Sequence, residues 1–320
     1  MKQMIETDLC PCRSGKTIEL CHCLQTNGDL IPLDVSTSPP LPQTGYAHPK
    51  CYAGIFQDCS HKISGEHFVS ESILKELCSN GGVRTSGMRW LDQGESKIFS
   101  VSSLRSNVLC TRHNSVLSGV DTVGWGFFCH IRDFQNAFND KTSEKLMETS
   151  LFNGHDVERW MLKVLCGLVA SKNHSQKIKT LNTLVPEDWL RVLYGLEYFT
   201  DGFGIYYVVK KGDPRSATTG ISINVVWDIS QTHLLGLQIG VNNMNFFLAV
   251  KHPGEYNMKT LFPEMDYRLA GFSFTEKSGR KKKDKNRKFI MLGWRLPHNT
   301  KARNIIVDPR PLWEMAIVTS

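Results

Sequence analysis

A carboxylate and an imidazole stand side by side at Glu66 and His67, and a carboxamide follows later in the chain at Asn114. A histidine that is neutral near pH 7 can take a proton from an attacking water. Carboxylate and amide oxygens are hard ligands that suit Mg²⁺ or Mn²⁺, and such a cation can neutralise the charge that develops on a phosphate. These residue types predict a site that hydrolyses a phosphodiester bond.

Metal-ligand residues flank this site on both sides. Two cysteines precede Glu66, and a cysteine and a histidine directly precede Asn114. Thiolates and imidazoles are the ligands of tetrahedral structural zinc, so we expect a zinc ion to join the two distant segments and to hold Asn114 rigidly. His61 is a competing ligand, and burial of the cysteines without a metal is the alternative. The four expected ligands are Cys51, Cys59, Cys110 and His113.

Residues 49–122 resemble the HNH family of ββα-metal nucleases. The resemblance rests on the Glu66-His67 pair, on Asn107, and on the Cys-x-x-His-Asn motif that ends at Asn114. It implies that His67 is the general base. It also implies that Glu66 and Asn114 bind one divalent cation, Mg²⁺ or Mn²⁺, and that Asn107 orients the base.

Two further residues of this stretch need comment. His113 stands where the family commonly has a second cysteine, and zinc accepts either ligand. Asp121 is either a helper near the site or a helix-terminal residue, and we favour the second interpretation. The alternative for the whole stretch is a zinc module of the treble-clef type, which binds nucleic acid or a protein without cutting.

The first 24 residues contain a second cysteine-rich segment, in which a Cys-x-Cys pair is followed after eight residues by Cys-His-Cys. This spacing resembles the SEC-C zinc motif, with Arg13 where that family usually has glycine. The resemblance implies a second structural zinc ion and a docking module for another macromolecule, such as a protein partner. A group of free cysteines is the alternative. The expected ligands are Cys10, Cys12, Cys21 and His22, with Cys23 as an alternative to His22.

The rest of the chain predicts an α+β fold. Residues 25–48 are rich in Pro, Ser, Thr and Gly, as is typical of a linker. Residues 123–199 are expected to form a helical connector, because apolar residues recur there at helical spacing. Residues 200–320 alternate apolar and polar residues, which predicts a mainly antiparallel β domain. The helical face is formed by Val157, Trp160, Val164, Leu165 and Leu168, which we interpret as packing.

Shorter elements are expected within and after the central stretch. Ser70–Leu77 predicts a short helix, and residues 79–106 predict a loop and a hairpin. Pro186 is suited to the first turn of a helix that ends near Gly195. A tight hairpin is expected at Asn242-Asn243, because Asn tolerates left-handed backbone angles.

The net charge of +7 is compatible with a nucleic-acid partner. A dense basic run between two expected strands could neutralise phosphates of DNA, which would add affinity without sequence specificity. A solvated loop is the alternative. The residues expected to bind nucleic acid are Lys281, Lys282, Lys283, Lys285, Arg287 and Lys288.

The sequence contains no apolar run long enough for a membrane helix, and its start lacks the apolar region of a secretory signal. We therefore expect a cytoplasmic protein with no membrane partner, in which most of the ten cysteines bind metal rather than form disulfides. The expected function is a metal-dependent endonuclease acting on DNA. Free-standing HNH proteins with additional domains resemble restriction and phage-defence effectors, which suggests that biological setting.

Overall fold

The computed structural model describes residues 17, 22–24, 30–78, 81–86, 95–137, 148–172, 184–208, 221–230, 232–241, 244–256, 258–276, 288–296 and 298–307. Within these ranges the elements are, in order, β1 (His22–Leu24), β2 (Leu30–Pro32), η1 (Gly54–Phe56), β3 (Ile63–His67), α2 (Glu71–Glu76), β4 (Val83–Ser86), β5 (Ser96–Phe99), η2 (Val101–Ser103), β6 (Arg105–Cys110), α3 (Thr111–Val116), α4 (Ser118–Asn136), β7 (Glu148–Asn153), α5 (Gly154–Ala170), α6 (Glu187–Leu193), β8 (Gly204–Val208), β9 (Ile221–Trp227), β10 (Leu234–Val241), β11 (Met244–Ala249), α7 (Met258–Leu261), β12 (Met265–Tyr267), β13 (Leu269–Glu276), β14 (Lys288–Gly293) and β15 (Asn299–Val307).

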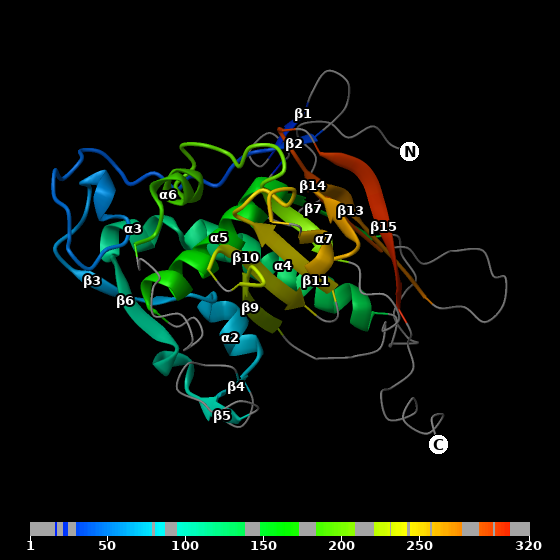
Figure 1. Cartoon of the computed structure of the whole chain (residues 1–320), viewed down its shortest axis with the longest axis horizontal. Helices are drawn as coiled ribbons and strands as arrows, with labels where there is room; N and C mark the ends of the chain where they lie inside the picture. Colours follow the sequence, from blue (N-terminus) through cyan, green and yellow to red (C-terminus); the bar gives the residue numbers. More distant parts are fainter. Residues whose placement is uncertain are drawn as a thin grey trace.

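Helix α5 occupies the middle of the molecule, between β3, β6 and α3 at one end and the strands β13 to β15 at the other (Figure 1). Every residue from Gly154 to Val169 is buried, so the helix is enclosed on all sides. It packs closely against α4, where a Cβ on Gly124 would lie 2.3 Å from the indole of Trp160. The apolar face that the sequence predicts is therefore part of a core that surrounds the whole helix.

The central stretch contains two paired strands, β3 and β6, and the helix α3. The two strands pair antiparallel, with Ser64 opposite Leu109 and Glu66 opposite Ser106. Two steps along β3 thus match three steps along β6, which is a β-bulge, and bulges increase the local twist of a strand. Helix α3 begins directly where β6 ends, because Cys110 is both the last residue of the strand and the N-cap of the helix.

Two larger sheets follow, and they confirm an α+β fold with mostly antiparallel strands. One sheet has the order β12-β8-β11-β10-β9, and all its described pairs are antiparallel. The other has the order β15-β13-β14-β7 and is mixed, because β15 runs parallel to β13 and β7 runs parallel to β14. The two parallel pairs depart from the expected antiparallel arrangement, and they exist because distant segments of the chain complete this sheet.

Several local expectations are confirmed. Helix α2 follows Ser70, a hairpin of β4 and β5 lies within 79–106, and α6 follows Pro186 and ends near Gly195, whose φ is +71°. Strands β10 and β11 pair up to Val241 and Met244, as a two-residue hairpin requires, although residues 242–243 themselves lie outside the described residues.

The expected segment boundaries agree less well with the structure. The boundary after residue 122 falls inside α4, and the helical connector 123–199 contains β7, a strand of the mixed sheet. The described part of the expected linker is bound to the core, since the amide of Val35 donates to Asp156 at 2.9 Å. One apolar core joins the expected linker, nuclease and connector segments. The packing of the helices, and not the local composition, therefore decides where one segment ends and the next begins.

Candidate functional site

A buried cluster of three thiols and one imidazole forms where the sequence predicts zinc. The Nδ1 atom of His113 lies 3.6 Å from the sulfur of Cys51, 3.6 Å from that of Cys59 and 3.3 Å from that of Cys110. All four ligand atoms lie within 4.8 Å of one another. Zinc bonded tetrahedrally to sulfur and nitrogen separates those ligands by about 3.6 Å. The cluster could therefore hold a metal ion such as zinc, and the predicted set of ligands is confirmed as a group.

Two short structures present these ligands. The turn of η1 brings Cys51 and Cys59 together, and Gln57 inside it has a left-handed φ of 52°. On the other side, the sulfur of Cys110 accepts a hydrogen bond from the backbone N–H of His113, as an N-cap side chain does. The metal ligands thus lie at the junction of β6 and α3, so closing the cluster fixes the direction of the helix.

The electrostatics of the cluster favour a metal-binding imidazole. Burial lowers the pKa of His113 to about 4, so its ring is neutral at pH 7 and offers a lone pair. The competing ligand His61 is exposed, and its ring lies 4.3 Å from that of Tyr46 outside the cluster. His113 is therefore the histidine ligand.

A cleft of about 490 Å³ opens beside the cluster, along β3 and α3. Glu66, His67 and Asn114 all line it, although they come from two segments of the sequence. Asn107 is not among the residues that line the cleft. It is exposed, in the bulged part of β6, with its Oδ1 atom 3.9 Å from where a Cβ on Gly65 would lie. Three of the four expected catalytic residues thus share one cavity.

His67 is the last residue of β3 and is largely buried. Its Nε2 atom lies 3.1 Å from the carbonyl oxygen of Val101 and 3.1 Å from Nε of Arg105, and its Nδ1 atom lies 3.6 Å from a carboxylate oxygen of Glu71. The carbonyl of Val101 can only accept and favours the tautomer with the proton on Nε2. The Nε–H of Arg105 can only donate and favours the tautomer with the lone pair on Nε2 and the proton on Nδ1, toward Glu71. Burial lowers the pKa of His67, so the ring is neutral at pH 7.

Lys163 enters the floor of the cleft from α5, and sequence reasoning missed it. Its ammonium forms an ion pair with Glu66 and contacts both oxygens of Asp121, at 2.6 and 2.7 Å. It also donates to the carbonyl of His67 at 3.2 Å. Burial alone would lower the pKa of Lys163, but the carboxylates of Glu66 and Asp121 raise it, so the group stays charged. A lysine within the apolar second half of α5 was the signal available in the sequence.

Asp121 occupies both of the positions considered for it, the end of a helix and the edge of the expected site. It lies in the first turn of α4, and it also lines the cleft. Ser70 donates to its Oδ1 atom at 2.6 Å and accepts from the indole N–H of Trp160 at 3.0 Å. The carboxylate is therefore held in place by α2, α4 and α5 together.

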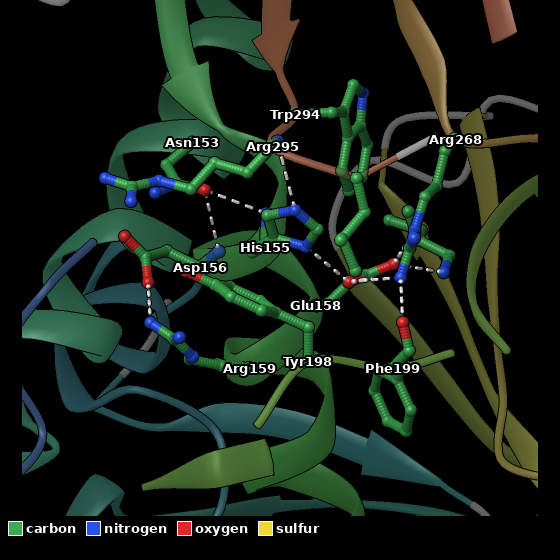
Figure 2. Close-up of polar contacts among 12 residues, drawn as sticks. Asn153, His155, Asp156, Glu158, Arg159, Tyr198, Phe199, Arg268, Trp294 and Arg295 are labelled. Atoms are coloured by element: carbon green, nitrogen blue, oxygen red, sulfur yellow. Dashed lines mark hydrogen bonds and ion pairs between the residues drawn. The ribbon is translucent and has the colours of Figure 1, made fainter. Parts of the chain in front are cut away.

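A second polar cluster surrounds the start of α5 (Figure 2). Asn153 is the N-cap, with its side-chain oxygen accepting from the backbone N–H of His155 at 2.9 Å. The carboxylate of Glu158 accepts from the Nε atom of Arg268 at 2.9 Å and from the amide of Ile205 at 3.0 Å, while Arg268 donates to the carbonyl of Phe199 (Figure 2). The charges of Glu158 and Arg268 neutralise each other. We therefore interpret this cluster as structural, since it joins α5 to β8 and to the residue that directly precedes β13.

The expected sites outside the central stretch are only partly visible. Cys10, Cys12, Cys21 and the basic residues Lys281, Lys282, Lys283, Lys285 and Arg287 lie outside the described residues. His22 lies in β1, and Cys23 follows it there, but the orientation of these side chains is not described. Lys288 lies on β14, where it forms an ion pair with Glu148 and sits 5.4 Å above the ring of Phe134. Its charge is thus already matched within the fold.

No protein-family model, curated protein or solved structure matches this chain. Within the described residues, no helix combines the length and apolar character needed to cross a membrane.

Proposed function

We propose that this protein is a metal-dependent phosphodiesterase of the HNH type that cleaves DNA. The observation that carries the proposal is the meeting of Glu66, His67 and Asn114 in one cleft, beside a Cys₃His cluster at the junction of β6 and α3. Asn114 is far from the Glu66-His67 pair in the sequence, and packing alone does not require a carboxamide to share a cavity with that carboxylate and imidazole.

His67 supplies the base. In the tautomer that carries its proton on Nε2, directed at the carbonyl of Val101, the Nδ1 atom can accept a proton from water as that water attacks phosphorus. The hydrogen bond to the carbonyl also stabilises the imidazolium that forms. Glu71 lies 3.6 Å from Nδ1 and stabilises the same charge. The ring is therefore held in one orientation before the substrate arrives.

Glu66 and Asn114 would hold the divalent cation. Their chemistry fits, because a carboxylate and an amide oxygen are ligands that Mg²⁺ and Mn²⁺ accept, and both residues face the same cleft. Lys163 balances one of the two carboxylates in the floor, so one negative charge remains for the cation. When bound, the cation would neutralise charge on the phosphate and on the leaving oxygen.

Two basic side chains at the cleft favour a polyanionic substrate. Lys62 is exposed, and Arg105, which also pairs with Glu71 at 3.8 Å, is about half exposed, and both line the cavity. Contacts from such side chains to phosphate oxygens position a nucleic acid without reading its sequence. The substrate class that these features favour is a nucleic-acid backbone, and we propose DNA.

The test is cleavage of supercoiled plasmid by the wild type and by His67→Ala, with Mg²⁺, with Mn²⁺ or without a divalent ion. We expect the variant to lose about 10²- to 10⁴-fold in rate, the usual contribution of a general base. His61→Ala is the matched control, because this histidine is exposed and lies outside the cleft. It should cut as the wild type does.

A pair of asparagine variants tests the site assignment. Asn114→Ala should abolish metal-dependent cleavage, whereas Asn107→Ala should retain it because Asn107 is exposed and does not line the cleft. Equal cleavage by the wild type and His67→Ala would mean that the base is wrongly assigned. Salt-dependent DNA binding without any cleavage would favour a zinc module that binds nucleic acid and does not cut it.

A further inference from the structure

The floor of the cleft is completed by a helix that the resemblance to HNH nucleases does not include. Lys163 comes from α5, about fifty residues after Asn114, and its side chain is only 1% exposed. Its ammonium contacts three groups: the carboxylate of Glu66, both oxygens of Asp121 and the carbonyl of His67. Two of these three groups belong to the residue pair that we place at the centre of the reaction.

The surrounding packing fixes the position of this ammonium. A Cβ on Gly167 of α5 would lie 2.7 Å from Cβ of Phe68, so the helix lies directly against the chain that leaves β3. Trp160, one turn before Lys163, donates to Ser70, and Ser70 donates to Asp121. An ammonium held by a fully enclosed helix and by three acceptors has little freedom, so the groups that it contacts are held as well.

The two carboxylates around Lys163 explain why a positively charged side chain is needed at this position. Glu66 and Asp121 both contact one nitrogen atom, so their carboxylates are neighbours in a buried floor. Two such carboxylates repel each other, and the ammonium that lies between them offsets this repulsion. Asn114 lines the same cleft, with its side-chain amide donating to Ser64 at 2.8 Å, so the position of the Glu66 carboxylate decides whether the two can act together.

We propose that Lys163 is a positioning residue of the nuclease site, which holds the Glu66 carboxylate beside Asn114 and the backbone of His67 in place. This inference rests on the function proposed above. It extends the site from β3, β6 and α3 to the helices α4 and α5. Asp121 serves in it as the second anchor of the ammonium.

The decisive variant keeps the charge of the floor unchanged. Lys163→Met combined with Asp121→Asn removes one positive and one negative charge, so Glu66 remains the single net charge of the group. If Lys163 positions Glu66, we expect this double variant to lose about 10²-fold in kcat, the cost of a displacement of about 1 Å in a reacting group. The KM for DNA should stay within about threefold, because Lys62 and Arg105 still line the cleft. Lys163→Arg keeps the charge and should recover much of the lost rate.

Binding of Mn²⁺, followed by electron paramagnetic resonance on the zinc-loaded protein without DNA, gives a readout besides cleavage. Glu66→Gln identifies the signal from the cleft. We expect the double variant to bind Mn²⁺ about tenfold more weakly than the wild type, with near-unchanged circular dichroism. A double variant that binds Mn²⁺ and cuts DNA like the wild type would overturn the positioning role and leave the nuclease proposal standing. A wild type that neither binds Mn²⁺ in the cleft nor cuts DNA would overturn both.

Discussion

The Cys₃His cluster makes a prediction whose size follows from its place in the chain. Its ligands join segments that are far apart, since Cys51 and His113 are 62 positions apart. Closing a loop of that length in the unfolded chain costs about 4 kcal/mol of conformational entropy, if a metal bridge is treated like a disulfide. Loss of the metal should therefore reduce the free energy of unfolding by at least about that amount, in addition to any loss of metal–ligand bonding.

Cys110→Ala is the variant to make, and Cys166→Ala is its matched control. Both thiols are completely buried, but Cys166 lies on α5 outside the cluster. Removing a buried sulfur without a metal should cost roughly 1–2 kcal/mol through the cavity that it leaves. Cys110→Ala should lose one zinc per chain by elemental analysis and exceed the control's loss of stability by at least about 4 kcal/mol in urea unfolding, because the cavity cost is common to both variants.

Chelation supplies an independent check of the same reasoning. A strong zinc chelator should destabilise the wild type and Cys166→Ala equally, and it should have much less effect on Cys110→Ala, which has already lost the ion. If Cys110→Ala keeps the zinc content of the wild type, or is no less stable than the control, the cluster does not hold a structural metal and the argument from loop closure is wrong.

Two further predictions concern the polar groups around α5. Burial raises the pKa of Asp156 from 3.8 to about 6, so in that interval the unfolded chain is ionised while the folded carboxyl keeps its proton. The stability of the wild type relative to Asp156→Asn should therefore fall as the pH rises from 4 to 7, by at most about 3 kcal/mol in urea unfolding, and a difference that rises with pH would contradict this. Glu158→Gln leaves the buried guanidinium of Arg268 without its ion pair and should cost about 3–5 kcal/mol. The double variant Glu158→Gln with Arg268→Met should recover part of this loss of stability in thermal unfolding. If it recovers none, the two side chains contribute to stability independently of each other.

Local chemistry made much of the site predictable. Ligand types and spacing identified all four members of the Cys₃His cluster, because the preference of zinc for thiolate and imidazole depends on the residues themselves. The Glu66-His67 step and Asn114 were found in the same way, and all three line one cleft. Helix α2 and the hairpin of β4 and β5 were also predicted, and the strands β9 to β11 followed from the alternation of apolar residues.

Contacts between distant segments of the chain could be found only in the tertiary structure. Lys163 lies on a helix whose apolar period predicts packing, and nothing within α5 indicates that its ammonium reaches Glu66 and Asp121. A bulge in β6 separates Asn107 from the cleft, and a bulge has no clear signal in one strand alone because it depends on the register with its partner. The parallel pairing of β7 with β14 is likewise a relation between segments that are far apart in the chain. The sequence by itself determined which residues can bind a metal or take a proton. Helix packing and strand register determined which of these residues meet in space. Packing and register depend on contacts between distant parts of the chain, and no local sequence pattern connects those parts.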